Sequence, residues 1–88
     1  MPKQPSYGNR KNIVGVNIKR IRQSANLTQS QLAEKLQLMG YEIERLTVGR
    51  IETGNRFVPD YEVKAFADAL GVSFDHLFME HQPPESFE

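Results

Sequence analysis

Two stretches of this 88-residue chain decide its fold: IKRIRQSANLTQSQLAEKL, residues 18–36, and RLTVGRIETGNR, residues 45–56. In the first stretch, Thr28 and Gln31 form the T-x-x-Q pattern of a capping box, in which each side chain satisfies a backbone amide at the helix start. Apolar residues follow at helical spacing. In the second stretch apolar residues again recur on one face, until Gly54 stops the helix. The sequence therefore predicts two consecutive helices.

Similar signals predict three further helices. We expect the five helices at about residues 12–24, 28–39, 44–53, 60–70 and 73–78. Asn26 is suited to the left-handed turn after the first helix, whereas Asp60 and Ser73 are expected to cap the last two. The apolar side chains of the last helix and its end are assigned mostly to the core: Phe74, Leu77, Phe78 and Met79. The predicted fold is an all-α, compact five-helix bundle.

Composition indicates a single small domain with loose ends. Residues 1–10 are rich in proline and polar residues and are expected to form a flexible arm, residues 11–79 the domain, and residues 80–88 a flexible acidic tail. The absence of cysteine excludes disulfides and thiolate catalysis. No apolar run could span a bilayer and no stretch resembles a signal peptide, so a cytoplasmic protein is expected.

Charge is divided unevenly along the chain. Residues 1–56 carry ten Lys and Arg against four acids, a net charge of +6, whereas residues 57–88 have a net charge of −6. The chain as a whole is neutral. A cluster of positive charge in the half that holds the two decisive helices is typical of a nucleic-acid-binding surface.

In order and spacing, LTQxQLAxKL, R-I-E-x-G and ALGVSFDHLF together resemble the helix-turn-helix domain of phage repressors and Cro, the XRE family, over about residues 12–79. This resemblance implies that the second and third helices form the helix-turn-helix and that the third enters the major groove of DNA. It also implies a salt bridge between Arg22 and Glu52, which places the arginine near the DNA backbone.

The resemblance and the chemistry of the side chains assign the contacts. Arg45, Leu46 and Arg50 match the exposed recognition positions, where an arginine fork fits guanine and leucine meets only a thymine methyl group. Contacts to the DNA backbone, or to backbone and bases together, are expected from five residues: Gln29, Thr47, Asn55, Arg56 and Arg22.

Three features depart from the family pattern. The turn between the second and third helices is about five residues longer than the shortest family form, which indicates a subgroup with a lengthened turn. Glu44 stands where relatives place a serine cap, and its carboxylate would repel nearby phosphate. Gly49 lies inside the third helix, where it costs about 1 kcal/mol relative to alanine and leaves room for close approach of the backbone.

The sequence gives less support to other classes of function than to DNA binding. An enzyme is not expected, because no motif places a nucleophile or an acid–base pair, and no metal or cofactor is expected, because His76 and His81 lack further ligands. We expect a sequence-specific regulator, most simply a repressor, that occupies an operator in double-stranded DNA. Two matters stay open. The chain could pair as a homodimer through its C-terminal helix, through the tail that holds Phe87, or by assembly of monomers on DNA. Alternatively, it could be an antitoxin-like or antirepressor-like protein-interaction module.

Overall fold

Five α-helices follow one another in the computed structural model, which describes residues 9–79. They are α1 (Val14–Ser24), α2 (Gln29–Leu38), α3 (Arg45–Thr53), α4 (Asp60–Leu70) and α5 (Phe74–Phe78). This part of the chain contains no strand, so the predicted all-helical fold is confirmed. Except for Asn9 and Arg10, the expected arm and tail lie outside the described residues, as do His81 and Phe87.

Helix α1 begins two residues later than the sequence predicts. Asn12 is not helical; its Oδ1 accepts a hydrogen bond from the backbone N–H of Gly15 at 2.7 Å, so it caps the first turn from outside the helix. Asparagine favours such positions because its side chain competes with the backbone for hydrogen bonds. At the other end of α1, Asn26 has the left-handed conformation that the sequence predicts, with φ 62°.

The start of α2 has the predicted capping box. The backbone N–H of Gln31 donates to Thr28 Oγ1 at 3.0 Å, and the N–H of Thr28 donates to Gln31 Oε1 at 2.8 Å. Residues 39–44 then connect α2 to α3, and Gly40 has a φ of 98° in this connection. A positive φ is readily adopted by glycine, and the chain turns here at little cost.

The caps of the later helices differ from one another. Glu44 occupies the N-cap of α3 and makes no side-chain hydrogen bond there, in keeping with its expected weakness as a cap. The assignment of Asp60 as the cap of α4 is wrong. Pro59, already extended at φ −68° and ψ 159°, takes the N-cap position, and Asp60 becomes the first helical residue, where its charge favours the helix dipole. Ser73 caps α5 as predicted, accepting from the N–H of His76.

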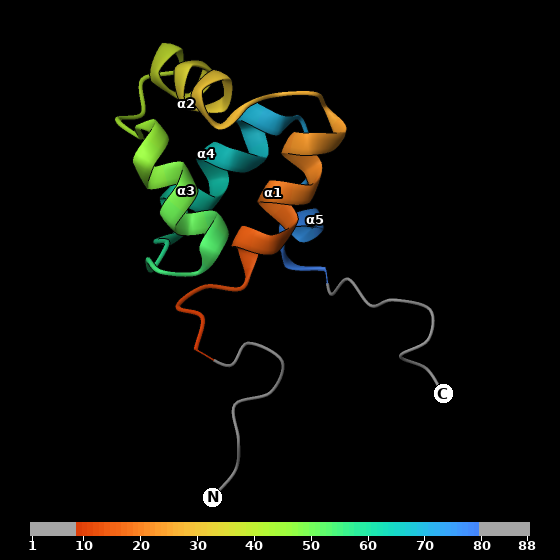
Figure 1. The fold of residues 1–88 in the computed structure, drawn as a ribbon. Helices are drawn as coiled ribbons and strands as arrows, with labels where there is room; N and C mark the ends of the chain where they lie inside the picture. The colour runs from red at the N-terminus through yellow and green to blue at the C-terminus, as the bar shows by residue number, and fades with distance from the viewer. Residues whose placement is uncertain (1–8, 80–88) are drawn as a thin grey trace, which may run out of the picture.

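The apolar sides of the five helices pack together in one core. Its fully buried side chains include Ile18, Leu32, Ile43, Ile51, Phe66 and Leu77. Figure 1 shows α3 beside α1, with α2 above them and α4 running behind, an arrangement in which α2 and α3 pack together and α5 packs on α1. None of the helices within residues 9–79 is long and apolar enough to cross a membrane.

Helix α5 contributes less to the core than the sequence predicts. Leu77 is fully buried, whereas Phe74, Phe78 and Met79 are exposed. A helix of little more than one turn presents only a narrow side to its neighbour, and here that side carries Leu77 alone. The end of α5 is also held by polar contacts, because the buried Asn17 of α1 donates to the backbone oxygens of Leu77 and Met79 at 2.9 and 2.6 Å.

Candidate nucleic-acid interface

One side of α3 faces away from the core and carries two arginines. Arg45, Leu46 and Arg50 are exposed, and Leu46 keeps 62% of its accessible surface. Val48 and Ile51, on the other side of the same helix, are fully buried. This division follows from the 3.6-residue repeat of an α-helix. The three residues predicted to read bases therefore share the exposed part of α3.

A buried ion pair joins α1 to the end of α3. Arg22 Nε lies 2.6 Å from Glu52 Oε2, and Arg22 Nη2 lies 3.0 Å from Glu52 Oε1, so the guanidinium binds the carboxylate with two parallel hydrogen bonds. Arg22 Nη1 also donates to the backbone oxygen of Leu27 at 2.8 Å. Both side chains are buried, and the salt bridge predicted from the sequence is present. It fixes the position of α1 and of the turn before α2 relative to α3.

Glu52 holds a second polar side chain, that of Gln29 at the first position of α2. Gln29 Nε2 donates to Glu52 Oε1 at 3.0 Å. Gln29 also lies beside Gly49, where an added Cβ would be 3.5 Å from Gln29 Oε1, an ordinary van der Waals separation. Packing within the protein therefore does not require glycine at position 49. Through Glu52, the end of α1, the start of α2 and the end of α3 are joined in one network.

The remaining residues predicted to contact the DNA backbone differ in their exposure and in their position relative to α3. Thr47 is half-buried and lies two residues from Gly49, so it is directed to the opposite side of α3 from Gln29. Asn55 is exposed just after α3, and its amide donates to Thr53 Oγ1 at 3.2 Å. The structure therefore does not bring Thr47 to the side of α3 beside which Gln29 lies.

Arg56 forms a salt bridge with Glu62 within the protein. Its Nη1 lies 2.6 Å from Glu62 Oε1, and its Nη2 lies 3.3 Å from Glu62 Oε2. The hydrogen bond to Glu62 raises the pKa of Arg56 above its ordinary value. Arg56 Nη1 donates as well to the backbone oxygen of Phe57 at 3.2 Å, so this side chain shapes the loop between α3 and α4.

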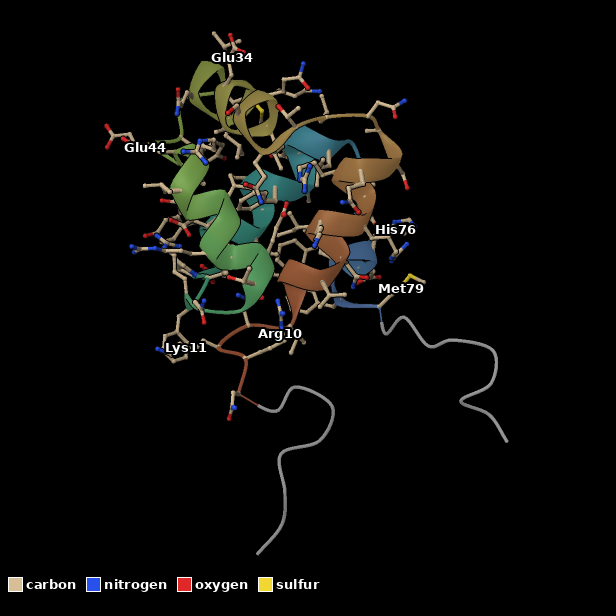
Figure 2. All side chains as sticks on the ribbon, in the orientation of Figure 1. Arg10, Lys11, Glu34, Glu44, His76 and Met79 are labelled. Carbon is tan, nitrogen blue, oxygen red and sulfur yellow. The ribbon has the colours of Figure 1, made fainter. Side chains whose placement is uncertain are left out.

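The two ends of α3 differ in charge. Figure 2 shows Glu44 directed outward beside the start of the helix, and Arg10 and Lys11 beside its other end. Glu52, close to the exposed face, is neutralised by Arg22. Among residues 9–79, no group of three or more His, Cys, Asp or Glu side chains is arranged to hold a metal ion.

A helix packed across the start of a second helix, with the outer side of the second helix exposed, is the geometry of a helix-turn-helix. The family model described as "Helix-turn-helix domain" matches residues 13–77, most of the chain. The chain belongs to the helix-turn-helix domain family. No curated protein and no solved structure gives a significant match to it.

The helix-turn-helix domain also contains a set of hydrogen bonds that sequence reasoning missed. In this polar clamp, Arg10 and Asn12 bind backbone oxygens at and just after the end of α3. Arg10 Nη2 donates to the backbone oxygens of Glu52 and Ile51 at 3.0 and 3.4 Å, and Asn12 Nδ2 donates to those of Ile51 and Arg56 at 3.0 and 2.8 Å. The last carbonyls of a helix have no partner within it, and a cation there favours the negative end of the helix dipole. The segment before α1 therefore completes the C-terminal end of α3.

The polar clamp depends on Gly15, a residue whose role sequence reasoning also missed. A Cβ at Gly15 would lie 2.0 Å from the backbone oxygen of Ile51, a distance that no side chain tolerates. The start of α1 thus approaches the end of α3 as closely as backbone atoms allow. No local pattern could reveal this, because the two segments lie more than 30 residues apart and Gly15 reads as an ordinary weak position in a helix.

Proposed function

We propose that this protein is a sequence-specific double-stranded DNA-binding regulator of the phage repressor and Cro type, in the subgroup with a lengthened turn between α2 and α3. The observation that carries the proposal is the exposed set of Arg45, Leu46 and Arg50 on α3, beside a first residue of α2 that Glu52 holds in place. The connection of residues 39–44 supports the subgroup. Residues 11–79 form the DNA-binding unit in this proposal, with Arg10 as an added anchor.

In this proposal, the exposed side of α3 contacts the bases and reads the sequence. The guanidinium forks of Arg45 and Arg50 match O6 and N7 of guanine in the major groove, and each such pair discriminates by about 1–3 kcal/mol against the wrong base. Leu46, between them on the helix, offers only apolar contact and suits the methyl group of thymine. We therefore expect an operator half-site in which guanines flank a thymine-containing step.

Contacts to phosphate position the domain on the duplex. Gln29 lies at the start of α2, where unpaired backbone amides and the positive end of the helix dipole favour an anion. Asn55 presents an exposed amide after α3. Arg22, Thr47 and Arg56 belong to the proposal as weaker contacts, because Arg22 is bound to Glu52, Thr47 is half-buried and Arg56 is bound to Glu62.

Regulation follows from occupancy, since no chemistry is needed once the operator is covered. A domain on a promoter excludes other proteins from the same stretch of DNA, and repression is the simplest result. Operators of this kind are palindromic when the protein binds as a two-fold dimer. We propose that a second copy pairs through α5, where Phe74, Phe78 and Met79 are exposed.

The same exposed residues favour a second candidate function, a protein-interaction module that keeps the fold. The rings of Phe74 and Phe78 lie with centroids 5.5 Å apart, tilted by 39°, and leave an aromatic surface in the acidic half of the chain. An antitoxin-like or antirepressor-like partner could be bound there. The two functions can be distinguished by the effect of salt on binding. A protein that neutralises several phosphates loses affinity for duplex DNA steeply as the salt concentration rises, whereas the affinity for a protein partner need not fall.

A random-duplex selection tests the proposal. The purified protein and an Arg45→Ala/Arg50→Ala variant are each taken through selection, and circular dichroism checks that the variant is folded, as the exposure of both side chains predicts. We expect a motif with the wild type and none, or a degenerate one, with the variant. Absence of any enriched sequence at low and at moderate salt would contradict DNA recognition and favour the protein-interaction module.

A further inference from the structure

Phe57, in the loop between α3 and α4, is a large aromatic side chain with no cover among the described residues. It keeps 70% of its accessible surface. Lys11, from the segment before α1, places its Nζ 5.7 Å from the centre of the Phe57 ring, within the range of a cation–π contact. Two segments far apart in the sequence thus present an ammonium group and an aromatic ring at one place on the surface.

The backbone on both sides of this pair is held by hydrogen bonds. The N–H of Lys11 donates to the backbone oxygen of Gly54 at 2.8 Å, directly at the end of α3. The residue before Phe57 is fixed by Asn12, and the carbonyl of Phe57 itself accepts from Arg56 Nη1 at 3.2 Å. The ring and the ammonium group are therefore positioned before any partner binds, which lowers the entropic cost of binding.

The charges around the pair are arranged so that Lys11 remains uncompensated. Arg10 covers the carbonyls at the negative end of the α3 dipole, and Glu62 is bound to Arg56. Within residues 9–79, no carboxylate lies at salt-bridge distance from Lys11. Of the three N–H donors of its ammonium group, those not directed at the ring remain for an anion.

The pair also extends the proposed interface along the axis of α3. Asn55 lies on the same loop as Phe57, and Figure 2 shows Lys11 beside the end of α3 that is opposite to Glu44. An aromatic ring next to a cation, continuous with a helix that reads bases, complements the alternating sugars and phosphates of a DNA strand: the cation suits the phosphate, and the ring suits the apolar face of deoxyribose.

We infer that Lys11 and Phe57 form a second contact to the DNA backbone, in which Lys11 Nζ binds a phosphate flanking the bases read by α3 and the Phe57 ring packs on the adjoining deoxyribose. The inference rests on the proposed function. It assigns the two residues a role in affinity and none in sequence choice, because neither reaches the exposed side of α3 where bases are read.

Fluorescence anisotropy with the selected duplex at a series of salt concentrations tests this contact. Lys11→Gln is expected to reduce the slope of log affinity against log salt by about 0.9, the value for one phosphate, so that its deficit shrinks about threefold between 50 and 200 mM salt. Phe57→Ala is expected to weaken binding several-fold without changing the slope, because an apolar contact releases no counterion. The preferred sequence is expected to stay the same in both variants.

Matched controls are available elsewhere in the chain. Lys64→Gln removes the same charge from α4, and Leu38→Ala removes a side chain that is 83% exposed from the end of α2; neither should change the affinity or the slope. Thermal unfolding of all four variants checks that each is folded. A wild type that fails to bind any duplex overturns the proposed function itself. Wild-type binding with unchanged slope in Lys11→Gln and unchanged affinity in Phe57→Ala, or equal effects in the controls, overturns only this inference.

Discussion

Gly15 and Gly49 both lie within a helix, yet their surroundings differ. Alanine at position 15 would collide with the backbone oxygen of Ile51, whereas alanine at position 49 would make ordinary contact with Gln29. We expect Gly49→Ala to raise the free energy of unfolding by about 0.5–1 kcal/mol, the helix preference of alanine. Gly15→Ala is expected to lower it by at least about 1–3 kcal/mol, as in an overpacked core. Urea denaturation measures both; equal signs for the two variants would contradict the packing described.

Glu52 has the largest predicted effect of any single charged residue. Removing it in Glu52→Ala leaves Arg22 buried without its counter-charge and Gln29 without its acceptor. Breaking a buried ion pair from one side costs about 3–5 kcal/mol, a large share of the stability of a small domain. Urea denaturation at low temperature is the measurement. The exposed pair of Lys64 and Asp68 is the control, since Lys64→Ala should leave stability unchanged within error.

At the scale of the helix, we expect the negative charge at the start of α3 to oppose the proposed DNA binding. Glu44 is exposed at the N-cap and makes no capping bond. Glu44→Gln is expected to raise affinity for duplex DNA about twofold at low salt, from the Coulomb energy of charges roughly 8 Å apart in water. The gain should shrink as salt is added. Glu34→Gln, on the outer side of α2 in Figure 2, removes an equal charge away from α3, and an equal gain there would contradict a local effect.

The helices themselves could be predicted where the signals are local. The capping box of Thr28 and the glycine stops after α3 and α4 depend on residues a few positions apart, and the structure has them as predicted. Asp60 was misassigned because proline at the preceding position already has N-cap geometry. The exposure of Arg45 and Arg50 also followed from helical periodicity alone.

What could not be predicted depends on contacts between distant segments. Arg10 and Asn12 bind carbonyls about 40 residues later in the chain, and Arg56 is bound to Glu62 across a turn. Nothing in the local sequence distinguishes these polar residues from solvated ones. The Arg22–Glu52 bridge is also long-range, and it was predicted only because the resemblance to phage repressors implies it.

At the scale of the whole molecule, the exposed aromatic surface of α5 lies on a different part of the fold from α3, and α5 packs on α1. A second copy bound there would leave α3 of both copies accessible. We expect a dimer on operator DNA in sedimentation experiments at tens of micromolar protein, and loss of that dimer in Phe78→Glu. Leu38→Glu is the control, because it adds the same charge at an exposed position at the end of α2, away from α5. A strict monomer in the presence of operator would contradict pairing.

Charge is divided between a basic part of the chain that carries α2 and α3 and an acidic part that carries α5, and we expect the basic part to face the DNA. One ratio of affinities tests the proposed sequence-specific binding most directly. The affinity of the wild type for the selected duplex is divided by that for a shuffled duplex of equal length at physiological salt. We predict a ratio of about 10³ or more; a ratio near one would show that α3 does not read bases.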